Sequence, residues 1–400
     1  MTAAHDKSID PENRESAEAR AMKLVVENFA QIRRAEIDFG DLTILVGPQA
    51  TGKSLLLQWF KVGLDMGEIL HALRQAGHDV KNRNNVLDLV FGEGISKSWH
   101  ENSRASIDAK QIGPSSWKGI KNKESGQVFY IPAHRALLLT DGWPAAFQKL
   151  NADTPVVARL FSQNLYQRFS GRESASLFPV PRLLKEEYRI LIDSAIFHGG
   201  AVVLENLGLS YRLRLSFEKD IQLPFMTWTS GQREFTPLLL GLYHVLIPRK
   251  QAKRPGVDWV VIEEPEMGLH PDAIAVCMLL VLDLLWRGYK VVISTHSPLV
   301  LDIVWAIKGI AANGADPSLL SRAFSVGDAG AVRGVMEHAL AAEYRAFFLS
   351  QDGESGRVSS QDISNLDPDS ERESEAYWGG LTKFSSQFGQ ALRRAVNESG

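Results

Sequence analysis

The sequence predicts an α/β fold, with a mixed sheet whose central strands are parallel and flanked by helices. Two observations lead to this prediction. Short apolar runs lie at 42–46, 259–262 and 290–294, as expected of strands that are buried on both faces of a parallel sheet. Between the last two runs, apolar residues follow helical spacing from about Asp272, which is the strand–helix–strand alternation of an α/β domain.

The residues around the first apolar run predict how this domain begins. Segments 22–28 and 35–39 have the composition of two further strands, and a helix is expected over 52–64 because its apolar residues would share one face. Residues 1–20 contain almost no large apolar side chains, so we expect a disordered leader there.

The middle of the chain is less regular. Helical spacing recurs over 66–76 and 144–169, whereas 92–126 is rich in Gly, Ser, Lys and Trp, which suits a small β subdomain or a mobile loop. A strand is expected at 128–131, and 201–217 alternates as two strands. The predicted organisation is a leader (1–20), a main α/β domain (21–65 and 200–310), an inserted helical and β subdomain (66–199) and a C-terminal extension with an acidic tail (311–400).

The composition is that of an ordinary globular chain. Of the 400 residues, 44% are hydrophobic and 23% are charged, and the net charge of −3 gives no overall attraction to nucleic acid or to an anionic membrane. Cys277 is the single cysteine, which excludes disulfides within the chain and cysteine-based metal sites. Because no secretory signal or membrane-spanning run is recognisable, we expect a cytoplasmic protein without a membrane partner.

A glycine-rich loop follows the first apolar run. Its sequence Gly-Pro-Gln-Ala-Thr-Gly-Lys-Ser matches the pattern G-x4-G-K-[ST], in which glycines let backbone N–H groups surround phosphate oxygens. The loop opens into a predicted helix whose N-terminal dipole attracts anions; Lys53 would reach the β- and γ-phosphates, and Ser54 would offer its hydroxyl to Mg²⁺. The residues expected to bind ATP here are Gly47, Pro48, Gln49, Ala50, Thr51, Gly52, Lys53 and Ser54.

Two carboxylates end the apolar run at 259–262. They lie at the carboxyl end of a strand, the edge of the sheet at which α/β folds bind ligands. One carboxylate is needed to hold Mg²⁺ and a second to polarise the attacking water, so we assign Glu263 to the metal and Glu264 to the water. His296 follows the next buried strand and is expected beside the same pocket, in contact with the γ-phosphate.

Four motifs together resemble one family. The run at 227–234 looks like the signature motif of ABC-type ATPases, and the full set resembles the RecF/SMC/OLD-like branch, which includes stand-alone bacterial AAA family ATPases. The resemblance covers 22–65 and 200–305. The matching runs are Leu-Val-Val-Glu-Asn-Phe (24–29), Thr-Trp-Thr-Ser-Gly-Gln-Arg-Glu (227–234), Glu-Glu-Pro-Glu-Met-Gly-Leu-His-Pro (263–271) and Ser-Thr-His-Ser-Pro (294–298).

This resemblance implies a P-loop NTPase with an ABC-type head, which uses ATP and Mg²⁺ and hydrolyses ATP to ADP and phosphate. It also implies a head-to-tail homodimer or a higher homo-oligomer, in which each ATP lies between the phosphate loop of one subunit and the signature loop of the other. Residues 268–270 match the D-loop, which crosses the dimer axis. The residues expected to reach the partner's nucleotide are Thr229, Ser230, Gly231 and Gln232.

The sequence departs from the family pattern in two places. Gln49 replaces the usual asparagine of the phosphate loop, and Glu263 replaces the usual aspartate, which lengthens the side chain that would hold the metal. The Q-loop glutamine is not identifiable; residues 132–135 are the closest region, with Arg135 expected to face the nucleotide. GTP is disfavoured because no Asn-Lys-x-Asp guanine-reading motif occurs.

The motifs leave three biological roles open. Residues 305–350 lack the clustered acids of a TOPRIM nuclease, and no heptad run predicts a coiled-coil arm. We expect a regulatory ATPase whose ATP-driven dimer controls a protein effector, as in phage defence. The alternative is a RecF-like ATPase of DNA repair or maintenance, and a transporter subunit is a third class. The candidate DNA contacts are Lys118, Lys121 and Lys123 beside Trp117, or Arg249, Lys250, Lys253 and Arg254.

Overall fold

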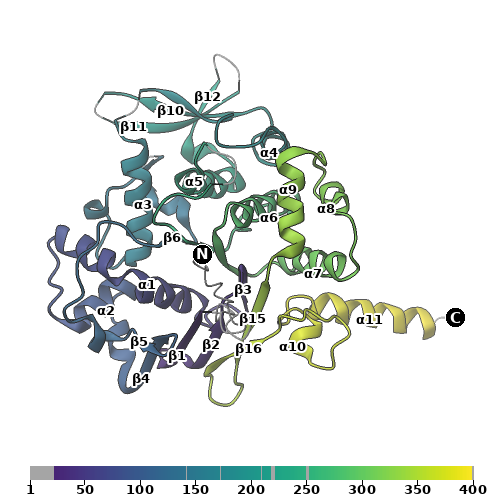
Figure 1. Cartoon of the computed structure of the whole chain (residues 1–400), viewed down its shortest axis with the longest axis horizontal. Helices are drawn as coiled ribbons and strands as arrows, with labels where there is room; N and C mark the ends of the chain where they lie inside the picture. The colour runs from purple at the N-terminus through teal and green to yellow at the C-terminus, as the bar shows by residue number, and fades with distance from the viewer. Residues whose placement is uncertain are drawn as a thin grey trace, which may run out of the picture.

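A ten-stranded mixed sheet forms the centre of the molecule (Figure 1). The computed structural model describes residues 22–398 except 141, 172, 209, 218–220 and 249–251. The expected leader, Arg249 and Lys250 therefore lie outside the described residues. In spatial order the strands are β5 (Lys110–Gln111), β4 (Trp99–Ile107), β1 (Lys23–Phe29), β2 (Ile32–Asp38), β16 (Val358–Asp362), β15 (Tyr344–Gln351), β3 (Leu42–Val46), β14 (Lys290–Thr295), β13 (Trp259–Glu263) and β6 (Val128–Ile131).

The central part of this sheet is parallel, as predicted. β15, β3, β14, β13 and β6 run parallel to one another, whereas β1 pairs antiparallel with β2 and with β4. Side chains of β3 alternate between two cores, with Ile44 and Val46 on one face and Leu45 on the other. Because both faces are buried, the strand reads as a continuous apolar run. The predicted α/β class, a mixed sheet with a central parallel part flanked by helices, is confirmed.

Helices cover both faces of the parallel part. One core contains α1 (Lys53–Gln75) and α2 (Arg83–Phe91), and the other contains α5 (Ser230–Val245), α6 (Pro271–Trp286), α7 (Pro298–Ala312) and α9 (Gly330–Ala341). The remaining helices are α3 (Val156–Phe169), α4 (Glu186–Ile192), α8 (Ser318–Ala323), α10 (Glu373–Ala376) and α11 (Lys383–Glu398). In Figure 1, α11 extends away from the body of the molecule. Within the described ranges, none of the helices is long and apolar enough to cross a membrane.

The central sheet draws strands from all the segments that the sequence analysis separated. β4, β5 and β6 come from 66–199, and β15 and β16 come from 311–400, so neither segment lies wholly outside the main domain. Region 92–126, expected to be a small β subdomain or a mobile loop, supplies β4, which pairs with β1. The two strands expected over 201–217 are present, in an antiparallel sheet of their own. That sheet contains β12 (Gln222–Pro224), β11 (Tyr211–Ser216), β10 (Ala201–Asn206) and β9 (Ala175–Phe178), and a separate ribbon contains β7 (Leu139–Thr140) and β8 (Trp143–Pro144).

A buried polar network ties α1 to β6. The expected helices 52–64 and 66–76 are one helix, which bends at Asp65 (φ −129°, ψ 25°). The Asp65 carboxylate accepts hydrogen bonds from the backbone N–H groups of Gln127 at 2.7 Å and Val128 at 2.8 Å. Lys61 Nζ donates to Asp65 at 2.8 Å and to the Val128 carbonyl oxygen at 2.7 Å. The helix after the glycine-rich loop is therefore fixed to the strand that leads into 132–135.

Candidate nucleotide-binding site

The glycine-rich loop joins β3 to α1 in a conformation that requires small residues. Gly47 and Gly52 have φ of 150° and 88°, and Ala50 has φ of 61°. A Cβ atom on Gly47 would lie 2.7 Å from the carbonyl oxygen of Leu349 in β15, so a side chain cannot be accommodated there. Gln31 Nε2 donates to the Ala50 carbonyl oxygen at 2.9 Å. The loop is therefore held between β15 and the turn that connects β1 to β2.

The N-terminus of α1 is open toward this loop. Gly52 is the N-cap, and no described side chain caps the first turn, which leaves its N–H groups for an anion. Lys53 Nζ donates to the carbonyl oxygens of Gly47 at 2.8 Å and Pro48 at 3.0 Å. Burial lowers the pKa of Lys53 to about 8, although the charge of Glu264 opposes this shift. The lysine thus rests on neutral carbonyl oxygens, at the place where a phosphate would give it a charged partner.

The proposed metal residues, Ser54 and Glu263, lie beside each other. Burial raises the pKa of Glu263, and the hydroxyls of Ser54 and Tyr130 lie near enough to oppose this shift. Glu263 Oε2 accepts a hydrogen bond from the Ala133 N–H at 3.0 Å. Its Oε1 is buried and makes no hydrogen bond of good geometry with any described residue. A buried carboxylate oxygen without a donor, beside a serine hydroxyl, fits Mg²⁺, which takes one or two protein ligands together with nucleotide phosphates.

Glu264 and His296 lie next to each other, at the carboxyl ends of the neighbouring parallel strands β13 and β14. The register of β13 and β14 pairs Glu263 with Ser294, so the residues that follow both strands are neighbours. Glu264 Oε1 lies 3.4 Å from His296 Nε2. The hydrogen bond with His296 lowers the pKa of Glu264, which keeps this carboxylate charged at neutral pH. Glu264 also has φ of 43°, a conformation that costs free energy for a non-glycine residue and often occurs in functional sites.

Glu266 is a third carboxylate, to which the sequence analysis gave no role. Its Oε1 accepts hydrogen bonds from Thr295 Oγ1 at 2.7 Å, from the His296 N–H at 2.6 Å and from the Ser297 N–H at 3.2 Å. Glu266 therefore fixes the backbone of His296 at the start of α7. The available signal was its position two residues after Glu264, within the Glu-Pro-Glu run.

Arg135 does not face the nucleotide position, which corrects the expectation from the sequence. Its side chain is fully buried and donates to the carbonyl oxygens of Glu234 at 3.0 Å, Glu263 at 3.0 Å and Glu264 at 3.4 Å. The arginine therefore connects the end of β13 to α5. The preceding residue, His134, is exposed, and its charge contributes to the lowered pKa of Glu264. Tertiary packing, and not a local sequence pattern, therefore determines which of these two adjacent side chains is buried.

The predicted signature loop forms the N-terminus of α5. Thr229 Oγ1 accepts from the Gln232 N–H at 3.3 Å, and Gln232 Oε1 accepts from the Thr229 N–H at 3.2 Å, which is a capping box. Gln232 is buried and also donates to the Ile196 carbonyl oxygen at 3.1 Å, so its side chain shapes the loop. A Cβ atom on Gly231 would lie 3.1 Å from the carbonyl oxygen of Gly268, in the D-loop region.

The exposed part of the signature loop is separate from the glycine-rich loop of the same chain. Thr229 and Ser230 are exposed at the surface. Among the hydrogen bonds of the described residues, none joins 229–232 to 47–54. One copy of the chain thus presents its phosphate loop and its signature loop as two unconnected surfaces.

A comparison of sequences finds one similar family. Residues 108–302 match the family described as "AAA domain, putative AbiEii toxin, Type IV TA system". This range contains the signature, carboxylate and histidine motifs, and the phosphate loop precedes it. Over this range the chain is similar to the AAA domains of that family. No protein of curated function matches the chain in sequence.

Solved structures similar to this chain include SMC head domains. An SMC head bound to the C-terminal winged-helix domain of ScpA is 11% identical, with a TM-score of 0.41, covering 86% of this chain and 97% of that chain. The SMC head domain from Thermotoga maritima is 12% identical, with a TM-score of 0.35, covering 86% and 98%. An Smc head with an extended coiled coil, bound to the C-terminal domain of ScpA derived from Pyrococcus furiosus, is 12% identical, with a TM-score of 0.38, covering 86% and 96%. The similarity to the AAA domain family comes from the sequence match, and not from these structures.

Proposed function

We propose that this chain binds Mg-ATP at the loop between β3 and α1 and hydrolyses ATP to ADP and phosphate within a head-to-tail dimer. The observation that supports this most directly is the convergence of five side chains near the open N-terminus of α1. Lys53 senses the charges of Glu263 and Glu264, Glu263 adjoins Ser54, and Glu264 contacts His296. Phosphoryl transfer needs little more from a protein than such positioning and charge.

Each side chain has a task that its surroundings suit. Lys53 and the first N–H groups of α1 would hold the phosphates, and Ser54 and Glu263 would hold Mg²⁺, which neutralises charge on the phosphate oxygens. The hydrogen bond with His296 lowers the pKa of Glu264, and this carboxylate would accept a hydrogen bond from the attacking water. His296, whose backbone Glu266 fixes, would contact the γ-phosphate.

The second half of the site would come from another copy of the chain. Thr229 and Ser230 are exposed at the N-terminus of α5, where backbone N–H groups and small hydroxyls suit a phosphate. Because these residues make no hydrogen bond to the phosphate loop within the described chain, a head-to-tail dimer brings the two surfaces together without rearranging either one.

The solution mass of Glu264→Gln, with and without Mg-ATP, tests this proposal. The variant should bind ATP, shift from the 44.3 kDa chain to twice that mass, and hydrolyse ATP at least about 100-fold more slowly than the wild type. Lys53→Ala is the control and should remain monomeric with ATP. Hydrolysis by Glu264→Gln at the wild-type rate would remove Glu264 from the reaction.

A second pair of variants tests the contribution in trans. Ser230→Ala combined with Gly231→Ala should bind ATP as the wild type does but lose at least about tenfold in turnover, because these contacts form only across the dimer. Thr227→Ala, in the same run but outside the residues expected to reach the partner's nucleotide, is the matched control. Normal turnover by a monomeric form of the double variant would exclude the shared site.

We further propose that the dimer regulates a protein effector in the cytoplasm. The description of the matching family names a toxin–antitoxin system, which supports a role of this kind in phage defence. The exposed face of α11 also supports a protein partner. Phe384, Phe388 and Leu392 are 73%, 74% and 67% exposed and lie four residues apart, so they form one apolar stripe on a helix that extends from the body (Figure 1).

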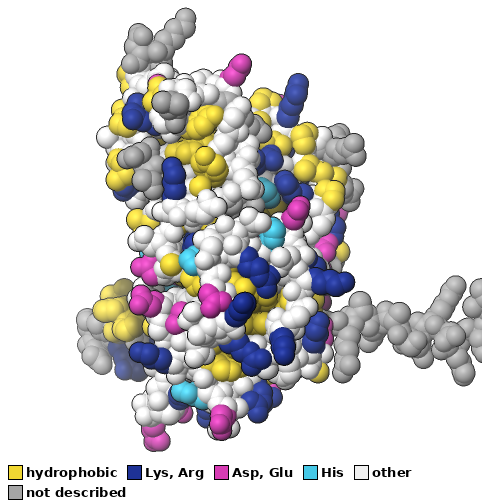
Figure 2. Space-filling view, turned by 90° about the vertical axis from the view of Figure 1, so that its left-hand side faces the viewer, with side chains coloured by type: hydrophobic (Ala, Val, Ile, Leu, Met, Phe, Trp, Pro, Cys, Tyr) yellow, Lys and Arg dark blue, Asp and Glu magenta, His cyan; other side chains and the backbone are white. Residues whose placement is uncertain are grey.

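Co-purification with the product of the neighbouring gene tests the effector proposal. Phe384→Ser with Phe388→Ser should reduce the captured partner at least about tenfold, since buried aromatic side chains dominate such interfaces. Gln387→Ala with Gln390→Ala changes the same helix outside the stripe and should have no effect. If both double variants capture the partner equally, α11 is not the docking element; if even the wild type captures none, the neighbouring product is not its effector. The alternative role, an ATPase that engages DNA, is supported by a different surface. There the exposed cations Arg74, Lys81, Arg83 and Lys118 line a pocket of about 290 Å³. Figure 2, which shows this side of the molecule, has Lys and Arg side chains gathered toward the centre and right of its lower half.

A further inference from the structure

The chain packs against the body of the molecule just before α11 begins. We call residues 377–381 the root of α11, because this helix starts two residues later and then extends from the body (Figure 1). Trp378 in the root is 5% exposed and belongs to the core that contains α7. The exposed stripe of α11 therefore continues into a segment that is packed into the core, and the contacts of that segment decide what a protein bound to α11 can influence.

The root contacts the strand that leads into the phosphate loop. A Cβ atom on Gly379 would lie 2.6 Å from Cδ2 of Phe348 in β15 and 3.1 Å from Cγ2 of Val46 in β3. Val46 and Phe348 are partners in the register of these two parallel strands. Gly47 follows Val46 directly, and a Cβ atom there would lie 2.7 Å from the carbonyl oxygen of Leu349. The root and the phosphate loop are thus in close contact with the same two strand ends.

The root also contacts α7, the helix that begins after His296. Trp378 Nε1 donates to Oδ1 of Asp302 in α7 at 2.6 Å. Further along α7, Lys308 Nζ donates to the Ser364 carbonyl oxygen, so the segment before the root is fixed to the same helix. The root therefore connects two elements: the paired ends of β3 and β15, and α7.

ATP in the proposed site would connect the same two elements. Its phosphates would lie on the loop that follows β3, and its γ-phosphate would contact His296, two residues before the start of α7. Because protein interiors are close-packed, a small displacement of α7 relative to β3 is passed on to a segment that contacts both. The nucleotide and the root are therefore coupled through the pair of elements that they share.

Two consecutive glycines separate the buried part of the root from the free helix. Gly379 and Gly380 have φ of 67° and 87°, in the left-handed region that glycine adopts readily. Gly379 is buried, whereas Gly380 is exposed, and a Cβ atom on Gly380 would meet no atom within 4 Å. The packing at Gly379 can thus transmit a displacement, and the open space around Gly380 lets α11 turn in response.

We propose that α11 is a regulatory arm whose orientation depends on the nucleotide, with the root as the connection. This inference rests on the proposed function, since nucleotide must bind at the loop between β3 and α1 for the root to respond. Because coupling between two sites is reciprocal, a protein partner bound to the stripe of α11 changes the affinity of the site for ATP. Couplings of this kind typically change an affinity by about 5- to 150-fold. The partner then regulates the site without touching the nucleotide.

The distance between two nitroxide labels on the full chain, measured by pulsed electron paramagnetic resonance, tests this arm. The labels are attached at Arg394→Cys in α11 and at Glu101→Cys in β4, both exposed positions, while the native Cys277 is 3% exposed and is not labelled. A non-hydrolysable ATP analogue with Mg²⁺ is the ligand, and an excess of unlabelled chain ensures that a dimer contains only one labelled copy. The distance should change by at least about 5 Å, which a turn of about 15° at Gly380 produces about 21 Å along the helix.

Gly379→Ala tests whether the root carries the response. Its Cβ atom would meet Phe348 and Val46, so the root is displaced and the change in distance should fall at least about threefold. The matched control is Gly314→Ala, at the far end of α7. Gly314 also has a left-handed φ, of 60°, but a Cβ atom there would meet no atom within 4 Å, so this variant should keep the full change.

Two measurements keep a failure interpretable. Thermal unfolding shows whether Gly379→Ala folds; if it does not, Trp378→Phe, which loses only the hydrogen bond to Asp302, carries the test and should reduce the change by at least about half. Titration calorimetry with the same analogue shows whether nucleotide binds. Binding without a change in distance would overturn the regulatory arm alone, and so would an undiminished change in the root variants. Absence of binding would overturn the proposed function together with this inference.

Discussion

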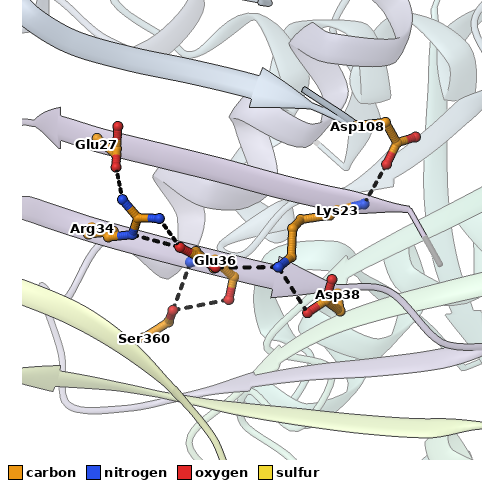
Figure 3. A network of polar contacts seen from close by, with 7 residues as sticks. All are labelled: Lys23, Glu27, Arg34, Glu36, Asp38, Asp108 and Ser360. Atoms are coloured by element: carbon orange, nitrogen blue, oxygen red, sulfur yellow. Dashed lines mark hydrogen bonds and ion pairs between the residues drawn. The ribbon is translucent and has the colours of Figure 1, made fainter. Parts of the chain in front are cut away.

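Two surfaces of the molecule carry charged side chains in opposite arrangements. The β1–β2 surface contains Lys23, Glu27, Arg34, Glu36 and Asp38, and the α1–α2 basic surface contains Arg74, Lys81, Arg83, Lys118, Lys121 and Lys123. On β1 and β2, Arg34 pairs with Glu27 and Glu36, and Lys23 pairs with Glu36 and Asp38 (Figure 3). Arg34, Glu27, Glu36 and Asp38 help to line a hollow of about 640 Å³, larger than the pocket of about 290 Å³ on the α1–α2 basic surface, and each of these four side chains is paired within the protein. On the α1–α2 surface, the described cations lack such partners. A hollow with charged walls therefore indicates a ligand only where the charges are left unpaired.

The candidate nucleotide-binding site also contains charged groups that form no ion pair, and the atoms concerned are buried. Lys53 rests on neutral carbonyl oxygens, and Oε1 of Glu263 and Oε2 of Glu266 are buried without a hydrogen-bond partner among the described residues. An unsatisfied buried polar atom costs about 1–3 kcal/mol of stability. Removing such a group should abolish ligand binding and spare the fold, whereas removing a paired surface charge should lower stability slightly and spare ligand binding.

The largest expected effect is that of Lys53→Ala on nucleotide binding. The variant should bind Mg-ATP at least about 1,000-fold more weakly, because it loses the charged contact with the β- and γ-phosphates. Without nucleotide, its stability should equal or exceed that of the wild type, since a partly desolvated ammonium is removed. Titration calorimetry and thermal unfolding measure the two quantities. A variant that binds ATP normally but unfolds several degrees earlier would make Lys53 a structural residue.

Arg135→Met tests the opposite case, a buried cation that already has its hydrogen-bond partners within the protein. Its removal leaves carbonyl oxygens of Glu234, Glu263 and Glu264 without their donor, so the free energy of unfolding should fall by about 3 kcal/mol. Turnover should fall more than ATP affinity, because the contact links the carboxylate strand to the signature helix. Denaturant unfolding and steady-state kinetics test this. An undisturbed unfolding midpoint would show that these hydrogen bonds contribute nothing net.

Local patterns predicted the parts of the site that lie close together in the sequence. Each motif lies at the end of an apolar strand: the glycine-rich loop, then Glu263 and Glu264, then His296. The apolar run therefore predicted the strand, and the motif at its end supported that prediction. β15 escaped prediction because its signal is long-range. It pairs with β3, about 300 residues earlier, and its burial between β3 and β16 depends on that pairing.

The orientation of side chains was the second feature that could not be predicted from the sequence. The run 132–135 pointed to the right region, but Arg135 turns into the core while His134 stays at the surface. The same holds for the α1–α2 basic surface, where Lys118 was a candidate from the sequence. Arg74 and Arg83 join it only because α1 and α2 pack beside the segment before β6.

A smaller effect is expected in the pH dependence of Mg-ATP affinity, which should reflect the titration of Lys53. Burial lowers the pKa of free Lys53 to about 8, and phosphate favours its charged form. Affinity should therefore be complete below this pKa and should fall as pH rises through it, by roughly tenfold between about pH 7 and about pH 9. Lys53→Arg keeps its charge over this range and should show a flatter profile. Equal profiles for both proteins would assign the dependence to another group.

The smallest expected effect is that of Glu36→Gln in the paired network. The hydrogen bond from Arg34 lowers the pKa of Glu36, so its contribution to stability is present at neutral pH and is lost as pH falls through this lowered pKa. Because the Glu36 side chain is 35% exposed and its charge is screened by solvent, the variant should lose only about 0.5 kcal/mol at neutral pH, and the difference should vanish in acid. Nucleotide affinity should not change. A stability loss of several kcal/mol would mean that this network stabilises more of the molecule than the β1–β2 surface.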